Sequence, residues 1–182
     1  MQCSELLKSV EDRFVDQLAR GREVAKRLRE EDLNRSPGPG KWSIGQIFEH
    51  MILSALSYEQ TMKSAVETAA KGASAEIRHT MFGKFIIKSA GPEGNSPAPK
   101  PFVPKNDHHT MQIVEKWIAQ TEGFLALARK AHGIDLCSYK IKNPIIPIFK
   151  MNLADCFEIL AEHTERHIRQ IEALADRSRT TA

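Results

Sequence analysis

The stretch 153–171, LADCFEILAEHTERHIRQI, has the apolar spacing of a helix that packs one face into a core. At about 100° per residue, its apolar side chains return to one side of the helix. Two histidines, His163 and His167, fall on or beside this stripe, where leucine would be the usual residue. We therefore predict a helix over about 152–176, capped by Asn152 with Asp155, whose stripe consists of Leu153, Cys156, Phe157, Leu160, Ile171 and Leu174.

The two histidines are one helical turn apart, and their spacing indicates a metal site. Burying an imidazole without a partner is costly, and i,i+4 spacing places both rings on one face, about 6 Å apart along the axis. Catalytic zinc sites typically use three protein ligands. His50 is the best third candidate, because it lies between Ile47 and Met51 of another apolar stripe and beside the small residues Ser54 and Ser57.

Other amphipathic segments precede this helix along the chain. Ser43 followed by Gln46 predicts a capping box that opens a helix over about 44–70. A short helix over 77–89 is a further candidate, although its period is ambiguous. The remaining helices are expected at about 4–32 and at about 107–131, the latter with Gly133 as its stop signal.

The connections between these helices are rich in helix-breaking residues. We name residues 91–104, which hold five prolines and two glycines, the proline-rich segment, and expect it to cross between two packed helices without regular structure. Breaks are also expected at 34–40 and 134–150. Because no strand alternation appears, we predict a single all-α domain, 1–182, built as a four-helix bundle.

Composition and charge exclude several classes of protein. The net charge of +3 is too small to indicate a nucleic-acid partner. No apolar run approaches the ~20 residues that span a membrane, and the first twelve residues carry charges where a signal peptide would be apolar. A cytoplasmic protein is therefore expected. Its three widely spaced cysteines do not fit a disulfide framework, and the sequence leaves open whether the bundle forms a homodimer.

Two segments, taken together, resemble the signature of the DinB-like superfamily. They are WSIGQIFEH at 42–50 and HTERHIRQI at 163–171. The resemblance implies a four-helix bundle of up-down-down-up type with a long crossover between helices two and three. It also implies a divalent metal, usually zinc or nickel, held by His50, His163 and His167. Characterised members include S-transferases and isomerases that use bacillithiol or mycothiol.

The predicted function is a divalent-metal-dependent enzyme that acts on a small molecule. A bound ion would lower the pKa of water toward about 7 and deprotonate a thiol, so the catalytic species would be metal-bound water or thiolate. The resemblance favours thiol S-transfer to an electrophile, with a low-molecular-weight thiol as co-substrate. A metal-dependent hydrolase and a non-catalytic metal- or ligand-binding helical bundle are the alternatives, and the sequence does not decide among the three.

Acidic residues beside the histidines are predicted to play no catalytic part. Zincin proteases place Glu next to a histidine, whereas Glu165 lies about 160° from His167 on the helix and should point away from the ion. Glu49 and Glu162 are adjacent to His50 and His163, so they should also face elsewhere. No carboxylate is therefore assigned as general base.

The remaining candidates are expected to be structural. His79 and His132 should be hydrogen-bonded core or boundary residues, His108 and His109 should be exposed, and Cys156 should be a small core residue. Trp42 is expected to pack on Ile47 as a hydrophobic staple at the mouth of the bundle. Gln170 is expected to hydrogen-bond a ligand imidazole.

Overall fold

The computed structural model describes residues 1–71 and 76–180, and these are mostly helical. Two very short strands are the remaining regular structure in the described residues. The elements, in chain order, are α1 (Cys3–Ala25), α2 (Glu30–Asn34), α3 (Ile44–Thr68), α4 (Met81–Ala90), the 3₁₀ turn η1 (Lys100–Phe102), α5 (Gln112–Lys130), β1 (Lys140–Lys142), β2 (Lys150–Asn152) and α6 (Leu153–Thr180).

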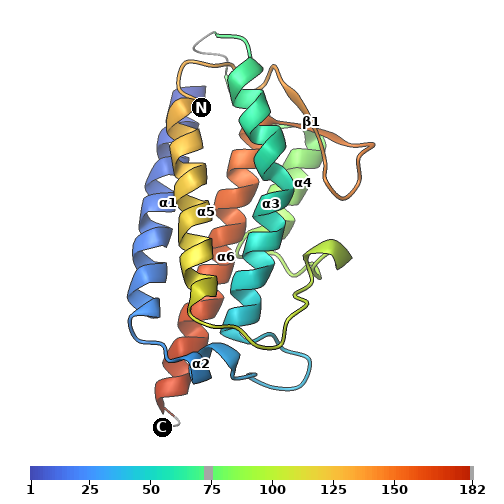
Figure 1. Cartoon of the computed structure of the whole chain (residues 1–182). Coiled ribbons are helices and arrows are strands. Elements are labelled where there is room, and N and C mark those ends of the chain that lie inside the picture. The colour runs from blue at the N-terminus through green and yellow to red at the C-terminus, as the bar shows by residue number, and fades with distance from the viewer. Residues whose placement is uncertain (72–75, 181–182) are drawn as a thin grey trace.

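Four long helices lie side by side along the length of the molecule (Figure 1). The helices α1 and α6 run in one direction, and α3 and α5 run in the other (Figure 1). Each of α1 and α3 packs against both α5 and α6. Because α3 and α5 are parallel, the chain must return between them along the whole length of the molecule. It does so through α4, the proline-rich segment and residues 105–111.

The core is built from the inward faces of all four long helices. Phe14, Phe48, Trp117 and Phe157, one from each helix, are fully buried or nearly so. The rings of Phe48 and Trp117 meet at a centroid distance of 5.5 Å, a favourable separation for an aromatic pair. The stripe predicted for the last helix is buried from Leu153 through Ile171, and its end at Leu174 is partly buried against the core.

Two predicted helices have different ends in the structure. The first helix was predicted to run to Asp32 but ends at Ala25, because the Asp32 carboxylate accepts a hydrogen bond from the Arg29 backbone N–H at 3.1 Å and starts the separate helix α2. The predicted helix 107–131 begins only at Gln112. Before it, the Asn34 side chain accepts from the His109 N–H at 2.8 Å and donates to the His109 carbonyl at 2.9 Å, which ties this stretch to the end of α2.

The prediction that the chain holds no strand is wrong within 134–150 and just beyond. β1 and β2 pair antiparallel with Lys140 opposite Asn152, forming a hairpin that leads directly into α6. Asn143 Oδ1 closes its loop by accepting hydrogen bonds from the N–H groups of Ile145 and Ile146. With three residues each, the strands are too short for alternation to be recognised in the sequence.

Other local predictions are confirmed. Ser43 and Gln46 form the expected reciprocal capping box at the start of α3. The proposed short helix at 77–89 exists as α4, and the proline-rich segment is irregular apart from η1. Gly133 follows α5 with φ +86°, a left-handed conformation that side chains disfavour, which explains why the helix stops there.

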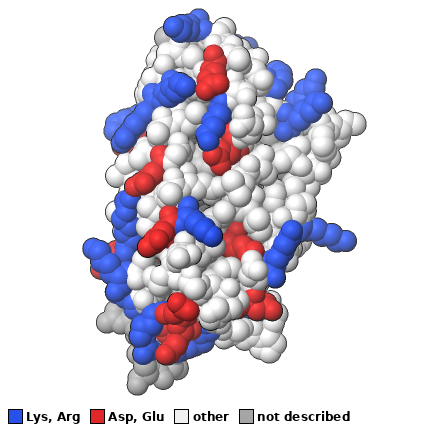
Figure 2. Space-filling model, in the orientation of Figure 1, with Lys and Arg blue, Asp and Glu red and all other residues white. Residues whose placement is uncertain are grey.

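The surface carries both signs of charge. Lysine and arginine side chains are interspersed with aspartate and glutamate on the face drawn in Figure 2. Among the described residues, no helix is both long enough and apolar enough to pass through a lipid bilayer.

Candidate metal centre

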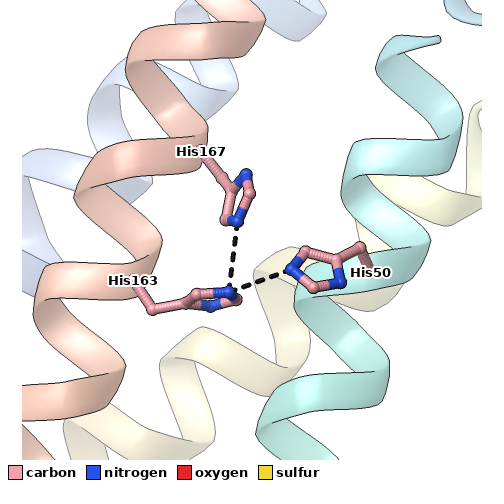
Figure 3. Close-up of side chains that lie close together, drawn as sticks. All are labelled: His50, His163 and His167. Atoms are coloured by element: carbon pink, nitrogen blue, oxygen red, sulfur yellow. Dashed lines mark hydrogen bonds between the residues drawn. The ribbon is translucent and has the colours of Figure 1, made fainter. Parts of the chain in front are cut away.

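Three histidines from two helices converge at one corner of the helical assembly. His50 comes from α3, and His163 and His167 come from successive turns of α6 (Figure 3). His163 Nε2 lies 3.0 Å from His50 Nε2 and 3.1 Å from His167 Nε2. One ring nitrogen of each residue lies within 4.8 Å of the others. The predicted third partner is therefore brought to the predicted pair, across 113 residues of chain.

The outward nitrogens of two rings determine what the inward nitrogens can do. His50 Nδ1 lies 2.8 Å from the carbonyl oxygen of Phe102, and His167 Nδ1 lies 2.8 Å from Gln170 Oε1. Both partners are oxygens that accept, so Nδ1 carries the proton in each ring and Nε2 presents a lone pair inward. His163 can donate one inward proton to only one of these two acceptors at a time.

This donor set fits a divalent cation. Two nitrogens bound to one ion at about 2.1 Å are separated by roughly 3.0–3.4 Å at the usual ligand angles, and the observed 3.0 and 3.1 Å agree with that range. Hydrogen bonds from the outer ring nitrogens to oxygen acceptors are the usual companions of histidine ligands. His50, His163 and His167 form a group that could hold a metal ion.

Burial keeps the three imidazoles neutral. It lowers the pKa of His50, lowers the pKa of His163 well below its usual value, and lowers the pKa of His167 to about 3. The neighbouring imidazoles and the positive charge of Arg166 depress the pKa values of His163 and His167 further. Neutral imidazole is the form that binds metal, so the site does not need to lose protons at neutral pH.

Residues 13–171 match the family model of the DinB superfamily. This range covers most of the chain and includes both histidine segments, 42–50 and 163–171. The chain belongs to the DinB superfamily. No curated protein and no solved structure matches it. The predicted family is thus confirmed, and its association with metal agrees with the three-histidine group of this DinB protein.

The proline-rich segment supplies part of the site in this DinB protein. Its 3₁₀ turn η1 presents the Phe102 carbonyl to His50, 52 residues away in the sequence. Glu49, which immediately precedes His50 in α3, accepts hydrogen bonds from the backbone N–H groups of Lys105 and Asn106 at 3.3 and 3.2 Å. The Glu49 carboxylate, which was not assigned as a general base, therefore holds the residues just after the proline-rich segment against α3.

Trp42 and Gln170 each contact one imidazole of the three-histidine group. The indole of Trp42 lies against the His50 ring, with centroids 4.9 Å apart. The packing of Trp42 on Ile47 stays a prediction. Gln170 makes the predicted hydrogen bond to an imidazole of the three-histidine group, that of His167. The backbone carbonyl of Phe102 was not predicted, because every residue has a carbonyl and sequence gives no signal for which one is used.

The other candidate residues lie outside the three-histidine group. Glu165 pairs with Arg20 and Arg169, and Glu162 pairs with Arg13. His79 and His132 are hydrogen-bonded to carboxylates, Cys156 is fully buried, and His108 is exposed. Two predictions of exposure are wrong. His132 was expected in the core or at its boundary but is exposed, and His109 was expected to be exposed but is buried, with Nε2 3.3 Å from Glu49 Oε2.

An apolar cavity of about 270 Å³ opens beside the histidines, and we refer to it below as the apolar cavity. All three imidazoles line it. Its remaining walls come from α4, the proline-rich segment, the β1–β2 loop and α6. Among the described residues that line it, there is no carboxylate and the one permanently charged side chain is Arg166. A small molecule in this cavity would have direct access to the histidines.

Proposed function

We propose that this protein is a divalent-metal-dependent enzyme that transfers a thiol sulfur to an electrophilic small molecule. His50, His163 and His167 would hold zinc or nickel within a four-helix bundle of DinB type. The observation that carries the proposal is the convergence of three neutral imidazole nitrogens at the wall of the apolar cavity.

The chain's own residues prepare the site in two ways. Phe102 and Gln170 hold the protons of His50 and His167 on their outer nitrogens, so both inner nitrogens are ready to bind. Burial keeps the rings neutral, and the apolar walls exclude water. A bound divalent ion would supply Lewis acidity that lowers the pKa of a thiol or of water.

The composition of the cavity supports S-transfer over hydrolysis. In S-transfer the thiol sulfur forms a bond to an electrophilic carbon, the leaving group departs with its electron pair, and the thiol proton passes to solvent. This reaction requires no protein carboxylate as general base, and the described lining offers none. Family membership supports the same choice by analogy.

Metal content tests the proposal first. Protein purified without a histidine tag should contain about one equivalent of transition metal by mass spectrometry, and His167→Ala should contain less than a tenth of an equivalent. His108→Ala, which removes an exposed histidine remote from the three-histidine group, is the matched control and should retain the metal. Absence of metal in the wild-type protein, with no change in melting temperature on adding zinc or nickel, would leave only the non-catalytic binding protein.

Turnover then distinguishes the two reactions. A panel of low-molecular-weight thiols with an electrophilic aromatic acceptor should give a thioether product, and His163→Ala should abolish its formation. Thiol-independent hydrolysis of the acceptor would support the hydrolase instead. Full turnover by His163→Ala would exclude the three-histidine site from the reaction.

A further inference from the structure

Arg166 is a charged residue that lines the apolar cavity and does not belong to the three-histidine group. It lies on α6 between His163 and His167 in sequence, and it is one of the residues that line the same cavity. Its positive charge contributes to the lowered pKa of each of the three imidazoles, which line the same cavity. A cation beside a group of metal ligands raises the cost of binding a positive ion.

The surroundings of Arg166 do not neutralise its charge. Its Nη1 donates to the carbonyl oxygen of Ser89 at 3.3 Å, and among the described residues no carboxylate forms an ion pair with it. Arg20 on α1 is different, because it pairs with Glu165 and Glu172 and its pKa is raised. Burial lowers the pKa of Arg166, although a guanidinium stays charged at neutral pH.

The rest of the cavity is suited to a hydrocarbon body. Aromatic and aliphatic side chains face it from three elements that are separate in the sequence. They are Phe82, Phe85 and Ile86 in α4, Pro97 and Pro99 in the proline-rich segment, and Ile145 and Ile146 in the β1–β2 loop. Such a lining favours apolar ligand groups, while a few placed polar groups fix their orientation.

We propose that the apolar cavity binds small carboxylates with an apolar body, the carboxylate at Arg166 beside the three histidines and the body against α4 and the β1–β2 loop. As a statement about the enzyme's substrate, this rests on the proposed function. Binding of such a carboxylate in the apolar cavity does not require the protein to have the proposed enzymatic function. The anion would satisfy the guanidinium and offset the combined positive charge of Arg166 and a bound ion.

The charge balance excludes the other common classes of small ligand. A cationic ligand would be repelled by Arg166, and no carboxylate lines the described cavity to attract it. A neutral polar ligand could accept a hydrogen bond from Arg166, but it would lose hydration against the largely apolar walls and leave the guanidinium charge uncompensated. An anion without an apolar body would leave most of the cavity lining in water.

Calorimetric titration with three matched probes tests both halves of the proposal. Octanoate carries the anion and the apolar body, octanamide carries the body alone, and acetate carries the anion alone. With metal-free wild-type protein, octanoate should bind about tenfold or more tighter than octanamide, and acetate should bind about a hundredfold or more weaker than octanoate. Equal binding of octanoate and octanamide, or of octanoate and acetate, would overturn the proposal.

Variants on α6 locate the anion. Arg166→Gln should bring the octanoate-to-octanamide preference of the metal-free protein to about threefold or less, while octanamide binding stays unchanged. Arg169→Gln, on the same helix but exposed and paired with Glu165, is the matched control and should keep the full preference. Retention of the preference in a folded Arg166→Gln protein would overturn the assignment. If this variant does not fold, the wild-type comparison of octanoate with octylammonium decides, because octylammonium should not bind detectably.

Repeating the titrations with zinc-loaded protein separates this proposal from the preceding one. A protein that takes up no metal but still prefers octanoate through Arg166 would contradict the proposed function and keep the anion site. A protein that holds metal at the three histidines but shows no Arg166-dependent preference would keep the metal centre and contradict the anion site.

Discussion

Two buried polar clusters lie two turns apart on α6 and differ in where their hydrogen bonds go. At the first, Asp155 is fully buried and accepts hydrogen bonds from every side. Its donors are the backbone N–H of Asn152 at 3.0 Å, the Thr80 hydroxyl at 2.7 Å, the Thr80 N–H at 3.2 Å and His79 Nδ1 at 2.9 Å. This cluster is complete without a ligand and holds the start of α4 against α6.

At the second cluster, the outward nitrogens of two of the three rings have acceptors within the chain. His50 and His167 donate outward to oxygens, and their inward nitrogens both face His163. The difference shows how a buried polar group serves structure or binding. In a structural cluster, each donor has an acceptor within the chain. In a binding cluster, acceptors face one another, so a positively charged ligand is needed to satisfy them.

Replacing Asp155 should give the largest effect on stability. Asp155→Ala leaves the donors of His79, Thr80 and Asn152 buried without partners, so the free energy of unfolding should fall by about 3–5 kcal/mol in denaturant titrations. Asp12→Ala removes an exposed carboxylate paired with Lys8 and should cost about 0.5 kcal/mol or less. A loss below about 1 kcal/mol for Asp155→Ala would show that this cluster does not stabilise the fold.

Acid should destabilise the metal-free protein through the histidine cluster. The pKa of His167 is about 3 in the folded chain against about 6.5 when unfolded, so between these values the unfolded state alone takes up the proton. Stability should be unaffected by this group above pH ~6.5 and should fall by about 2 kcal/mol between pH ~6.5 and pH ~5. Thermal unfolding across this range should show a shallower pH dependence for His167→Leu. Equal slopes would contradict the assignment.

Removing an outward hydrogen bond should weaken metal binding and spare the fold. Gln170→Leu frees the Nδ1 proton of His167 from its fixed acceptor, so zinc affinity should fall about tenfold in competition titrations with a chelator. Gln60→Leu, an exposed position on α3, is the control and should leave zinc affinity unchanged. Unchanged affinity in Gln170→Leu would mean that this bond does not orient the ligand.

Loosening the proline-rich segment should have the smallest effect. Glu49→Gln weakens the hydrogen bonds to the N–H groups of Lys105 and Asn106, so hydrogen exchange at both amides should become faster. Zinc affinity should fall only about threefold, because the Phe102 carbonyl is held indirectly. Glu59→Gln, which alters a salt bridge to Lys63 on the same helix, should change neither quantity. Slow exchange in Glu49→Gln would show that other contacts hold the segment.

Much of the site was predictable because helical periodicity is a local property. The i,i+4 spacing of His163 and His167 within an apolar stripe indicated two inward rings, and the stripe around His50 indicated a third. The same reasoning failed for His109, because a position before a helix has no periodicity to show that Glu49 covers it. It also failed for the three-residue strands β1 and β2, which are shorter than one readable alternation.

The sequence by itself determined the helical segments, their apolar faces and the paired spacing of His163 and His167, because these follow from residue spacing along one chain segment. It also named His50 as the third candidate, from a second apolar stripe and the family signature, but the structure brought the three rings together. Only the tertiary structure decided that a carbonyl of the proline-rich segment orients His50, that Arg166 faces the apolar cavity without a described acidic partner, and that α4 and the β1–β2 loop complete its walls. These features depend on contacts between residues 52 to 113 positions apart, and no local pattern encodes which distant groups will meet.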